Sequence, residues 1–230
     1  ERLPFGPYLS NGMRARVEVT VRRSRLYHSG VVAERVLGGI TDSGIQLASE
    51  EDESARQILV FVRGESDRFT ISIDTSGELL SRRGYRTEDS GAPLRETVAA
   101  ALLRLCGWDG STPLFDPTCG SGTLAIEAAL LALGRAPGLG RHFGFQDFPS
   151  YNPTLFAKIV DDLRATERAR ATTPPQIYAA DLRSEAVEIA QRNATRAGVA
   201  EHIRFSVTDV AQAKLPDGPH TLRIVARSTS

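Results

Sequence analysis

The first third of the chain alternates apolar and polar positions in a way that predicts a small α+β unit. Residues 13–22 alternate valine with polar neighbours, which is typical of a half-buried strand. Residues 58–62 and 69–73 are two further apolar runs, separated by the polar turn sequence RGESDR. Residues 29–36 carry three valines on one side of a short predicted helix. We therefore expect a helix and an antiparallel sheet within residues 1–77.

The pattern changes after residue 77. Glycine, serine and charged side chains dominate residues 78–91, and they predict a linker. From residue 92 onward, helical and strand patterns alternate, which favours a parallel, doubly wound α/β sheet over residues 92–230. The expected helices are 94–106, 121–133, 152–165 and 184–197, and the expected strands are 114–115, 177–180 and 203–207.

Composition narrows the class of protein. The length of 230 residues allows one generous domain, or one domain and part of another. The chain holds 28 basic and 28 acidic residues, so its formal net charge is zero. For the chain as a whole, this excludes a strongly basic nucleic-acid-binding surface and an acidic tail. Only Lys158 and Lys214 are lysines. The arginine excess suits phosphate and base recognition, and a GC-rich coding bias is the alternative explanation.

Cysteine content and hydropathy exclude further classes. Cys106 and Cys119 are too few for a disulfide framework, and the histidines and cysteines show no metal-binding spacing. No apolar run approaches the roughly 20 residues that span a bilayer. The first residues, ERLPFGPYLS, contain no signal-peptide core. We expect a cytoplasmic protein that binds neither a membrane nor a metal.

The stretch LFDPTCGSGTLAIEAAL at residues 114–130 carries the most chemical information. A strand ends in Asp116, and Gly120 and Gly122 permit a sharp turn into an apolar helix. This arrangement is typical of nucleotide binding at the carboxyl edge of a parallel sheet. The spacing matches neither the dinucleotide fingerprint nor the phosphate loop. Asp116 would repel a pyrophosphate but suits the ammonium and sulfonium groups of S-adenosylmethionine; a tight turn without a ligand is the alternative.

DPTCGSGTLAIEAAL resembles the cofactor motif of class I methyltransferases that modify exocyclic amino groups. Among these, the chain is similar to enzymes that join a THUMP RNA-binding domain to a methyltransferase, and above all to large-subunit ribosomal RNA guanine-N2 methyltransferases. The likeness continues in order up to about residue 219. It is carried further by RRSRLYHSG at 22–30, SIDTSGELLSRRGYR at 72–86, APLRETVAAALL at 92–103 and APGLGRHFGF at 136–145.

The resemblance implies a Rossmann-like class I methyltransferase sheet, incomplete, in residues 92–230. A partial THUMP-like RNA-binding module would precede it in residues 1–77. The implied cofactor is S-adenosyl-L-methionine, and the implied reaction is methylation of a guanine N2 amino group in large-subunit ribosomal RNA. The oligomeric state is not indicated by the sequence.

Several further residues join the expected cofactor site. Asp181 ends the strand IYAAD, where an acid reaches ribose hydroxyls; capping of the following helix is its alternative role. Asp209 follows the strand IRFSV and either accepts a hydrogen bond from adenine or belongs to a surface turn. The resemblance implies that the segment around Arg95 borders the cofactor, where Arg95 would pair with the methionine carboxylate. Cys119 is interpreted as a packing residue. The expected cofactor-binding residues are Asp116, Pro117, Thr118, Cys119, Gly120, Ser121, Gly122, Thr123, Asp181, Asp209 and Arg95.

Two arginine-rich segments also contain aromatic side chains. Arginine can hold phosphates while aromatic rings stack on unpaired bases. An ordinary solvated surface is the alternative interpretation, and the resemblance favours RNA. The expected RNA-binding residues are Arg22, Arg23, Arg25, Tyr27, His28, Arg82, Arg83, Tyr85 and Arg86.

The acceptor motif of such enzymes, Asn-Pro-Pro-Tyr or a close variant, would hold the target amino group after the next strand. Here the chain ends in LPDGPHTLRIVARSTS, and Tyr151-Asn152-Pro153-Thr154 is interpreted as a helix start. We therefore expect a truncated reading frame with an aberrant tail, an open sheet edge and no catalytic residue in this chain. A non-catalytic RNA- or cofactor-binding fragment and an amino methyltransferase acting on another nucleic acid remain alternatives.

Overall fold

The computed structural model describes residues 3–49, 51–88, 94–170, 176–213 and 222–223. The chain divides into two compact units. The first contains Glu1–Leu79 and His142–Leu155, and the second contains Leu80–Arg141 and Phe156–Ser230. Each unit has its own cluster of buried apolar side chains.

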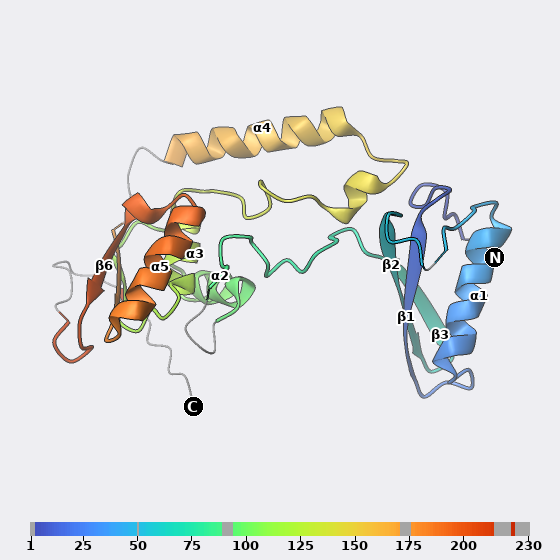
Figure 1. The fold of residues 1–230 in the computed structure, drawn as a ribbon, viewed down its shortest axis with the longest axis horizontal. Coiled ribbons are helices and arrows are strands. Elements are labelled where there is room, and N and C mark those ends of the chain that lie inside the picture. Colours follow the sequence, from blue (N-terminus) through green and yellow to red (C-terminus); the bar gives the residue numbers. More distant parts are fainter. Residues whose placement is uncertain (1–2, 50, 89–93, 171–175, 214–221, 224–230) are drawn as a thin grey trace. The chain divides into compact units, whose positions relative to one another are not determined.

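Among the described residues, the first unit contains a three-stranded sheet on which the helix α1 packs (Figure 1). Its elements in chain order are β1 (Arg14–Arg22), α1 (Ser29–Asp42), β2 (Gln57–Glu65) and β3 (Arg68–Ile73). The sheet order is β1-β2-β3. The pair β2–β3 is antiparallel, as predicted, but β1 and β2 run parallel, so the expectation of a wholly antiparallel sheet was wrong. The helix α1 lies between β1 and β2 in the chain and provides the crossover that parallel neighbours require.

The hairpin between β2 and β3 turns through Ser66 and Asp67, whose φ angles are 50° and 62°. Two successive left-handed residues match the twist of a tight hairpin. The core beneath the sheet gathers Ile40 of α1 with Ile58 and Val60 of β2. It also includes side chains from well beyond the hairpin in the chain.

The segment 142–155 belongs to this first unit although it lies far along the chain. Phe148 is buried in the same core. The backbone N–H of Phe145 donates to the Thr75 carbonyl at 3.0 Å, and the Ser150 hydroxyl donates to the Pro7 carbonyl at 2.7 Å. The short 3-10 helix η1 (Gly144–Asp147) lies within this segment.

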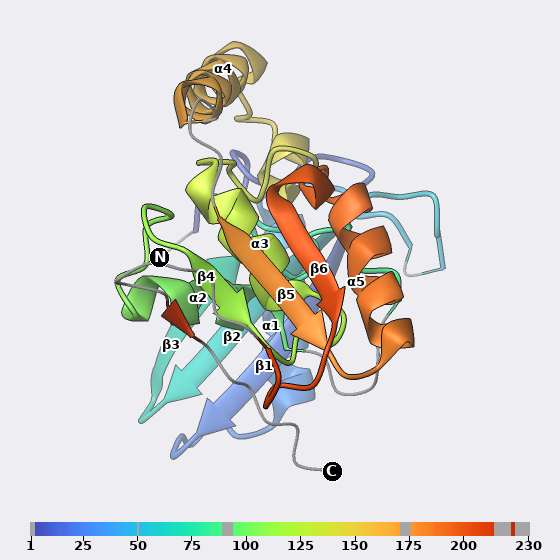
Figure 2. The same cartoon turned by 90° about the vertical axis from the view of Figure 1, so that its left-hand side faces the viewer.

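The second unit contains a four-stranded sheet with the order β6-β5-β4-β7. Every neighbouring pair in it is parallel, which confirms the predicted parallel α/β architecture. Among the described residues, α2, α3 and α5 lie on one face of this sheet, next to one another (Figures 1 and 2). The elements are α2 (Glu96–Leu105), β4 (Leu114–Asp116), α3 (Thr123–Ala132), α4 (Pro153–Arg170), β5 (Ile177–Asp181), α5 (Ser184–Arg196), the 3-10 helix η2 (Ala200–His202), β6 (Ile203–Val207) and β7 (Leu222–Arg223).

The helix α3 lies at the centre of this unit. It packs on β4 and β5 and touches both α2 and α5, so its side chains from Thr123 to Leu130 are all buried. This explains why the sequence of α3 is apolar on every side rather than on one stripe. The start of α4 agrees with the predicted helix start: the Asn152 side chain accepts the backbone N–H of Leu155 at 3.0 Å.

The short strand β7 was not predicted from the sequence. Leu222 pairs with Leu114, and Arg223 pairs with Phe115, so β4 is an inner strand of the described sheet. The chain order runs outward from β4 to β5 and β6 on one side and to β7 on the other. Such a reversal point is where open α/β sheets bind their ligands, at the carboxyl ends of the strands.

Candidate cofactor site

The glycine loop between β4 and α3 has a backbone that only glycine adopts readily. Gly120 has φ 54° and Gly122 has φ 83°, both in the left-handed region. A Cβ atom on Gly122 would lie 2.8 Å from the Cβ of Ala190 in α5. Gly122 therefore permits both the turn and the close contact between the start of α3 and α5. The Cys119 N–H donates to the Ala180 carbonyl at 2.8 Å and ties the loop to β5.

Asp116 lies at the carboxyl end of β4 and is only 3% exposed. Its Oδ1 accepts the backbone N–H of Thr118 at 3.3 Å. Burial raises the pKa of the Asp116 carboxyl to about 7, and the nearby charge of Asp181 adds to the rise, against the opposing hydrogen bond from Thr118. A cation beside this carboxylate would relieve the cost of its buried charge.

Asp181 lies at the carboxyl end of the neighbouring strand β5. Its Oδ2 accepts the backbone N–H of Gly120 at 3.0 Å, and its Oδ1 accepts the backbone N–H of Arg183 at 3.1 Å. The residue in the capping position of α5 is Arg183, which makes no side-chain capping bond. Asp181 thus fixes the glycine loop against β5 and brings a second carboxylate to the same edge as Asp116.

The remaining predicted residues of the loop are mostly buried. Pro117, Cys119, Ser121 and Thr123 are buried, whereas Thr118 is exposed. Burial raises the pKa of the Cys119 thiol, so the group stays protonated near neutral pH, which is consistent with a packing role.

Asp209 and Arg95, the other two predicted cofactor residues, each take part in a local hydrogen bond. Asp209 is half-buried just after β6, and its Oδ1 accepts the backbone N–H of Ala211 at 2.8 Å, so it forms a local turn. Arg95 is exposed and immediately precedes α2, where its carbonyl accepts the N–H of Ala99 at 2.9 Å. Their predicted roles towards adenine and a carboxylate stay predictions.

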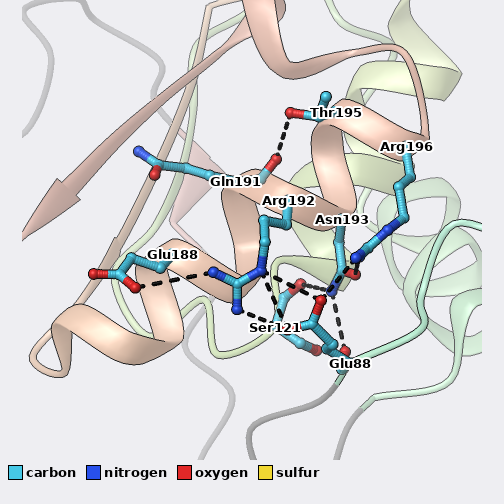
Figure 3. A network of polar contacts seen from close by, with 8 residues as sticks. All are labelled: Glu88, Ser121, Glu188, Gln191, Arg192, Asn193, Thr195 and Arg196. Carbon is cyan, nitrogen blue, oxygen red and sulfur yellow. Dashed lines mark hydrogen bonds and ion pairs between the residues drawn. The ribbon is translucent and has the colours of Figure 1, made fainter.

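Asn193 on α5 is a residue of this site that sequence reasoning missed. Its side chain is fully buried, and its Nδ2 donates to the carbonyls of Ser121 at 3.0 Å and Glu88 at 3.2 Å (Figure 3). Its Oδ1 accepts from Arg196 at 3.1 Å. The sequence did hold a signal, because Asn193 falls on the same helical stripe as the buried Ile189 and Ala190.

Glu88 joins this network from the predicted linker (Figure 3). Its carboxylate accepts from Arg192 at 2.7 Å and from Arg196 at 2.7 Å. The hydrogen bonds from Arg192 and then Arg196 lower the pKa of Glu88 to about 2. The network therefore connects the linker, α5 and the Ser121 carbonyl of the glycine loop.

Four of the residues predicted to bind RNA belong to the second unit, and three of them make contacts within it. The buried Tyr85 hydroxyl donates to Glu127 at 3.0 Å, and Arg83 pairs with the same carboxylate at 3.4 Å. Arg86 pairs with the buried Glu96 at 3.4 Å. Desolvation raises the pKa of Glu127. These contacts give Arg83, Tyr85 and Arg86 a packing role that sequence reasoning missed, although a glutamate inside an apolar helix was a signal for a buried partner. Arg82, in contrast, is exposed.

The predicted RNA-binding residues of the first unit gather in and after the end of β1. The Tyr27 side chain is exposed, and its ring lies 4.1 Å from that of His28, centroid to centroid. Arg25 pairs with Asp67 at 2.9 Å, which joins this segment to the hairpin turn. Arg22, Arg23, Arg25, Tyr27 and His28 are all exposed. RNA binding by them stays a prediction.

In the parts of the chain that the structure describes, no group of three potential metal-ligating side chains comes together. Within the same residues, no helix combines the length and the apolar character needed to cross a bilayer.

Comparison with known proteins places the chain among methyltransferases. The family UPF0020, described as an RMKL-like methyltransferase domain, matches residues 83–226. This match extends beyond residue 219, where the sequence-based likeness was expected to end. The chain is 43% identical over 163 residues to the ribosomal RNA large subunit methyltransferase K/L of Vibrio campbellii. That alignment covers 70% of this chain and 23% of its relative.

Solved structures support the same fold. A protein from Listeria monocytogenes, described as a predicted N6-adenine-specific DNA methylase, is 28% identical with a TM-score of 0.84, over 96% of this chain and 58% of that one. SMU.472, a methyltransferase solved in complex with SAH, is 26% identical with a TM-score of 0.84, over 97% of this chain and 59% of its own. The chain thus spans less than two thirds of these proteins.

Proposed function

Because this chain belongs to the UPF0020 family of RMKL-like methyltransferase domains, we propose that it forms the cofactor-binding part of an enzyme that methylates large-subunit ribosomal RNA. Its cofactor is S-adenosylmethionine, in keeping with a methyltransferase family and a structural relative that carries SAH, which is S-adenosylhomocysteine. The observation that carries the proposal is the pair of carboxylates, Asp116 and Asp181, beside the left-handed glycine loop.

The residues at this edge fit the cofactor chemically. Asp116 is a buried carboxylate whose raised pKa signals an unfavourable lone charge, and an ammonium or sulfonium group offsets that charge. Gly120 and Gly122 keep side chains away from the loop. Asp181 offers carboxylate oxygens suited to ribose hydroxyls, and Asp209 follows the next strand along the same edge.

When bound, S-adenosylmethionine supplies an electrophilic methyl group, and the chain's residues hold and orient it. We assign Asp116 to the cationic methionine portion, Asp181 to the ribose and Asp209 to the adenine amino group. Arg95 is assigned to the methionine carboxylate. The loop residues Pro117, Thr118, Cys119, Ser121 and Thr123 shape the backbone around the cofactor. Preorganised positioning of this kind lowers the barrier to an in-line methyl displacement.

The proposed acceptor is the N2 amino group of a guanine. The relative from Vibrio campbellii, named as a large-subunit ribosomal RNA methyltransferase, supports ribosomal RNA as the substrate. We further propose that residues 1–77 form a THUMP-like RNA-binding module, that 78–91 link it to the methyltransferase part in 92–230, and that the exposed arginines around Tyr27 contact the RNA. No catalytic residue is proposed within this chain.

A second candidate is amino methylation of adenine in another nucleic acid. The description of the Listeria monocytogenes structure as an N6-adenine-specific DNA methylase favours it. Both candidates share the cofactor site and the chemistry of an exocyclic amino group, so they differ in the acceptor base and in the nucleic acid that carries it.

Calorimetric titration with SAH and S-adenosylmethionine tests the cofactor site. We expect Asp116→Ala to weaken binding strongly, and a matched removal of an exposed carboxylate on α4, Asp161→Ala, to leave it unchanged. A folded wild-type chain that binds neither compound would contradict the assignment.

The acceptor is tested separately with methyl-labelled cofactor, undermodified ribosomal RNA and mass spectrometry of the digested nucleosides. N2-methylguanosine supports the first candidate. N6-methyladenosine from this RNA, or N6-methyl-2′-deoxyadenosine when DNA is supplied in place of the RNA, supports the second.

A further inference from the structure

The sheet of the first unit has one buried face and one open face. Ile58 and Val60 of β2 are buried in the core with Ile40 of α1. Side chains alternate along a strand, so Phe61 and Arg63 lie on the opposite face. In the part of the chain that the structure describes, α1 is the helix that packs on this sheet, and it lies on the buried side (Figure 1).

Phe61 is the aromatic side chain of the open face. It lies in the middle strand, 42% exposed, and is paired in register with Glu18 on β1 and Ser72 on β3. A shallow hollow of about 420 Å³ runs over β1 and β2 beside it. The hollow is lined by Glu18, Thr20, Arg22, Phe61, Val62, Arg63, Gly64 and Glu65. An exposed ring on a sheet is a surface on which an unpaired base can stack.

Arginines lie along the same face of the sheet, beginning with Arg63, two residues from Phe61 in β2. Arg22 of β1 and Arg68 of β3 both pair in register with Glu65 of β2, next to Arg63. A second hollow, of about 360 Å³, shares Arg63 and Glu65 with the first and extends to Arg68 and Thr70. Two hollows edged by guanidinium groups therefore adjoin across the sheet.

The carboxylates of this face do not cancel the arginines. Glu65 pairs with Arg63 at 3.4 Å, and Glu18 pairs with Arg16 at 3.1 Å. All four side chains are largely exposed, and exposed ion pairs are weak enough to exchange for a phosphate. Five arginines against two glutamates leave the face with net positive charge, which complements a phosphate backbone; the arginines are Arg14, Arg16, Arg22, Arg63 and Arg68.

We propose that this open face binds single-stranded RNA, with one unpaired base stacked on Phe61 and adjacent phosphates held by Arg22, Arg63 and Arg68. The inference rests on the proposed function, because it takes RNA as the substrate. It extends the predicted RNA contacts around Tyr27, with which it shares Arg22, onto the open face of the sheet. It also gives the N-terminal unit a way to recognise unpaired nucleotides without reading their sequence.

The test measures fluorescence anisotropy of a short, labelled, single-stranded oligoribonucleotide with the full chain. Phe61→Ala and Phe61→Leu should weaken binding by about 5- to 150-fold, because both remove a stacking ring. Phe61→Tyr keeps the ring and should bind within about twofold of the wild type. The matched control is Leu105→Ala, which truncates an exposed apolar side chain on α2 and should have no effect. Arg68→Ala should reduce the salt dependence of log K by about 0.7.

Several outcomes would overturn this site. Unchanged affinity in Phe61→Leu is one, and equal loss in Phe61→Tyr and Phe61→Leu is another. If sedimentation shows that Phe61→Ala converts a dimer into a monomer, the face binds a second copy instead. Wild-type protein that binds SAH but not the oligonucleotide refutes this site while leaving the cofactor assignment intact. Wild-type protein that binds the oligonucleotide but not SAH would contradict the proposed function and leave the RNA-binding face supported.

Discussion

At the scale of single residues, the chain shows how far a sequence can locate a buried polar group. The position of Asp116 after a short apolar strand was enough to predict that it would lie at the carboxyl ends of the parallel strands. Asn193 and Glu127 were missed because a polar residue within a helix is usually solvated. Only the phase of the apolar stripe in α5, and the absence of any polar face in α3, distinguish them from surface residues.

The raised pKa of Asp116 predicts a stability that depends on pH. Its carboxyl titrates near 3.8 when unfolded and near 7 when folded, so the folded state binds the proton more tightly. The contribution of Asp116 to the free energy of unfolding should therefore fall as pH rises from about 4 to about 7, by roughly 4 kcal/mol, and stay level above that. In Asp116→Asn this contribution should be absent. Urea unfolding of both proteins across this range measures the difference, and a gap that does not grow with pH would contradict it.

The buried amide of Asn193 predicts a loss of both stability and cofactor affinity. Asn193→Ala removes the donors to the Ser121 and Glu88 carbonyls and the acceptor of Arg196. We expect about 2–4 kcal/mol of destabilisation, at roughly 1 kcal/mol or more for each group left unpaired, and weaker SAH binding because the loop backbone is released.

The matched control is Thr195→Val on the same helix, whose exposed hydroxyl bonds only within α5. It should change the free energy of unfolding by less than about 0.5 kcal/mol. Equal stability of the two variants, measured by urea unfolding, would show that the buried hydrogen bonds of Asn193 do not stabilise the fold.

At the scale of elements, the sequence predicted the long helices and strands and failed where local pattern carries no information. The parallel pairing of β1 and β2 was missed because alternation reveals a strand but not the direction of its neighbour. The helix predicted at residues 29–36 already held the clue, since a strand–helix–strand order favours parallel strands. The strand β7 has two residues, too few for any periodicity, and only its pairing with β4 defines it.

The contact between the glycine loop and α5 predicts a large effect for a small substitution. Gly122→Ala places a Cβ 2.8 Å from that of Ala190 and forces alanine into a left-handed backbone conformation. We expect about 2–4 kcal/mol of destabilisation from the backbone strain and overpacking together. Gly140→Ala is the matched control, because its Cβ would meet nothing within 4 Å. Thermal unfolding that ranks the two variants alike would refute the role of Gly122.

At the scale of the whole molecule, the division into units departs from the order of the chain. The segment 142–155 follows α3 in sequence, yet Phe148 is buried in the core of the first unit. No composition shift marks this return, so a linear division at residues 78–91 could not anticipate it. The linker itself contributes Tyr85 to the core of the second unit. The family resemblance extended to residues 136–145, but only tertiary contacts reveal what the segment 142–155 packs against.

The two separate cores predict two unfolding transitions with different ligand responses. Ile40 and Leu103 are both fully buried, the first in the core of the N-terminal unit and the second in that of the cofactor-binding unit. Truncation of either to alanine should cost about 2–5 kcal/mol, because it leaves a cavity in that unit alone.

In differential scanning calorimetry, Ile40→Ala should lower one transition and Leu103→Ala the other. Added SAH should raise only the transition that Leu103→Ala lowers, because a ligand stabilises the part that binds it. The two variants serve as controls for each other, since they remove similar volumes at equal burial. A single transition that both substitutions lower and SAH raises would show that the cores unfold together, and the cofactor would then stabilise the N-terminal unit as well.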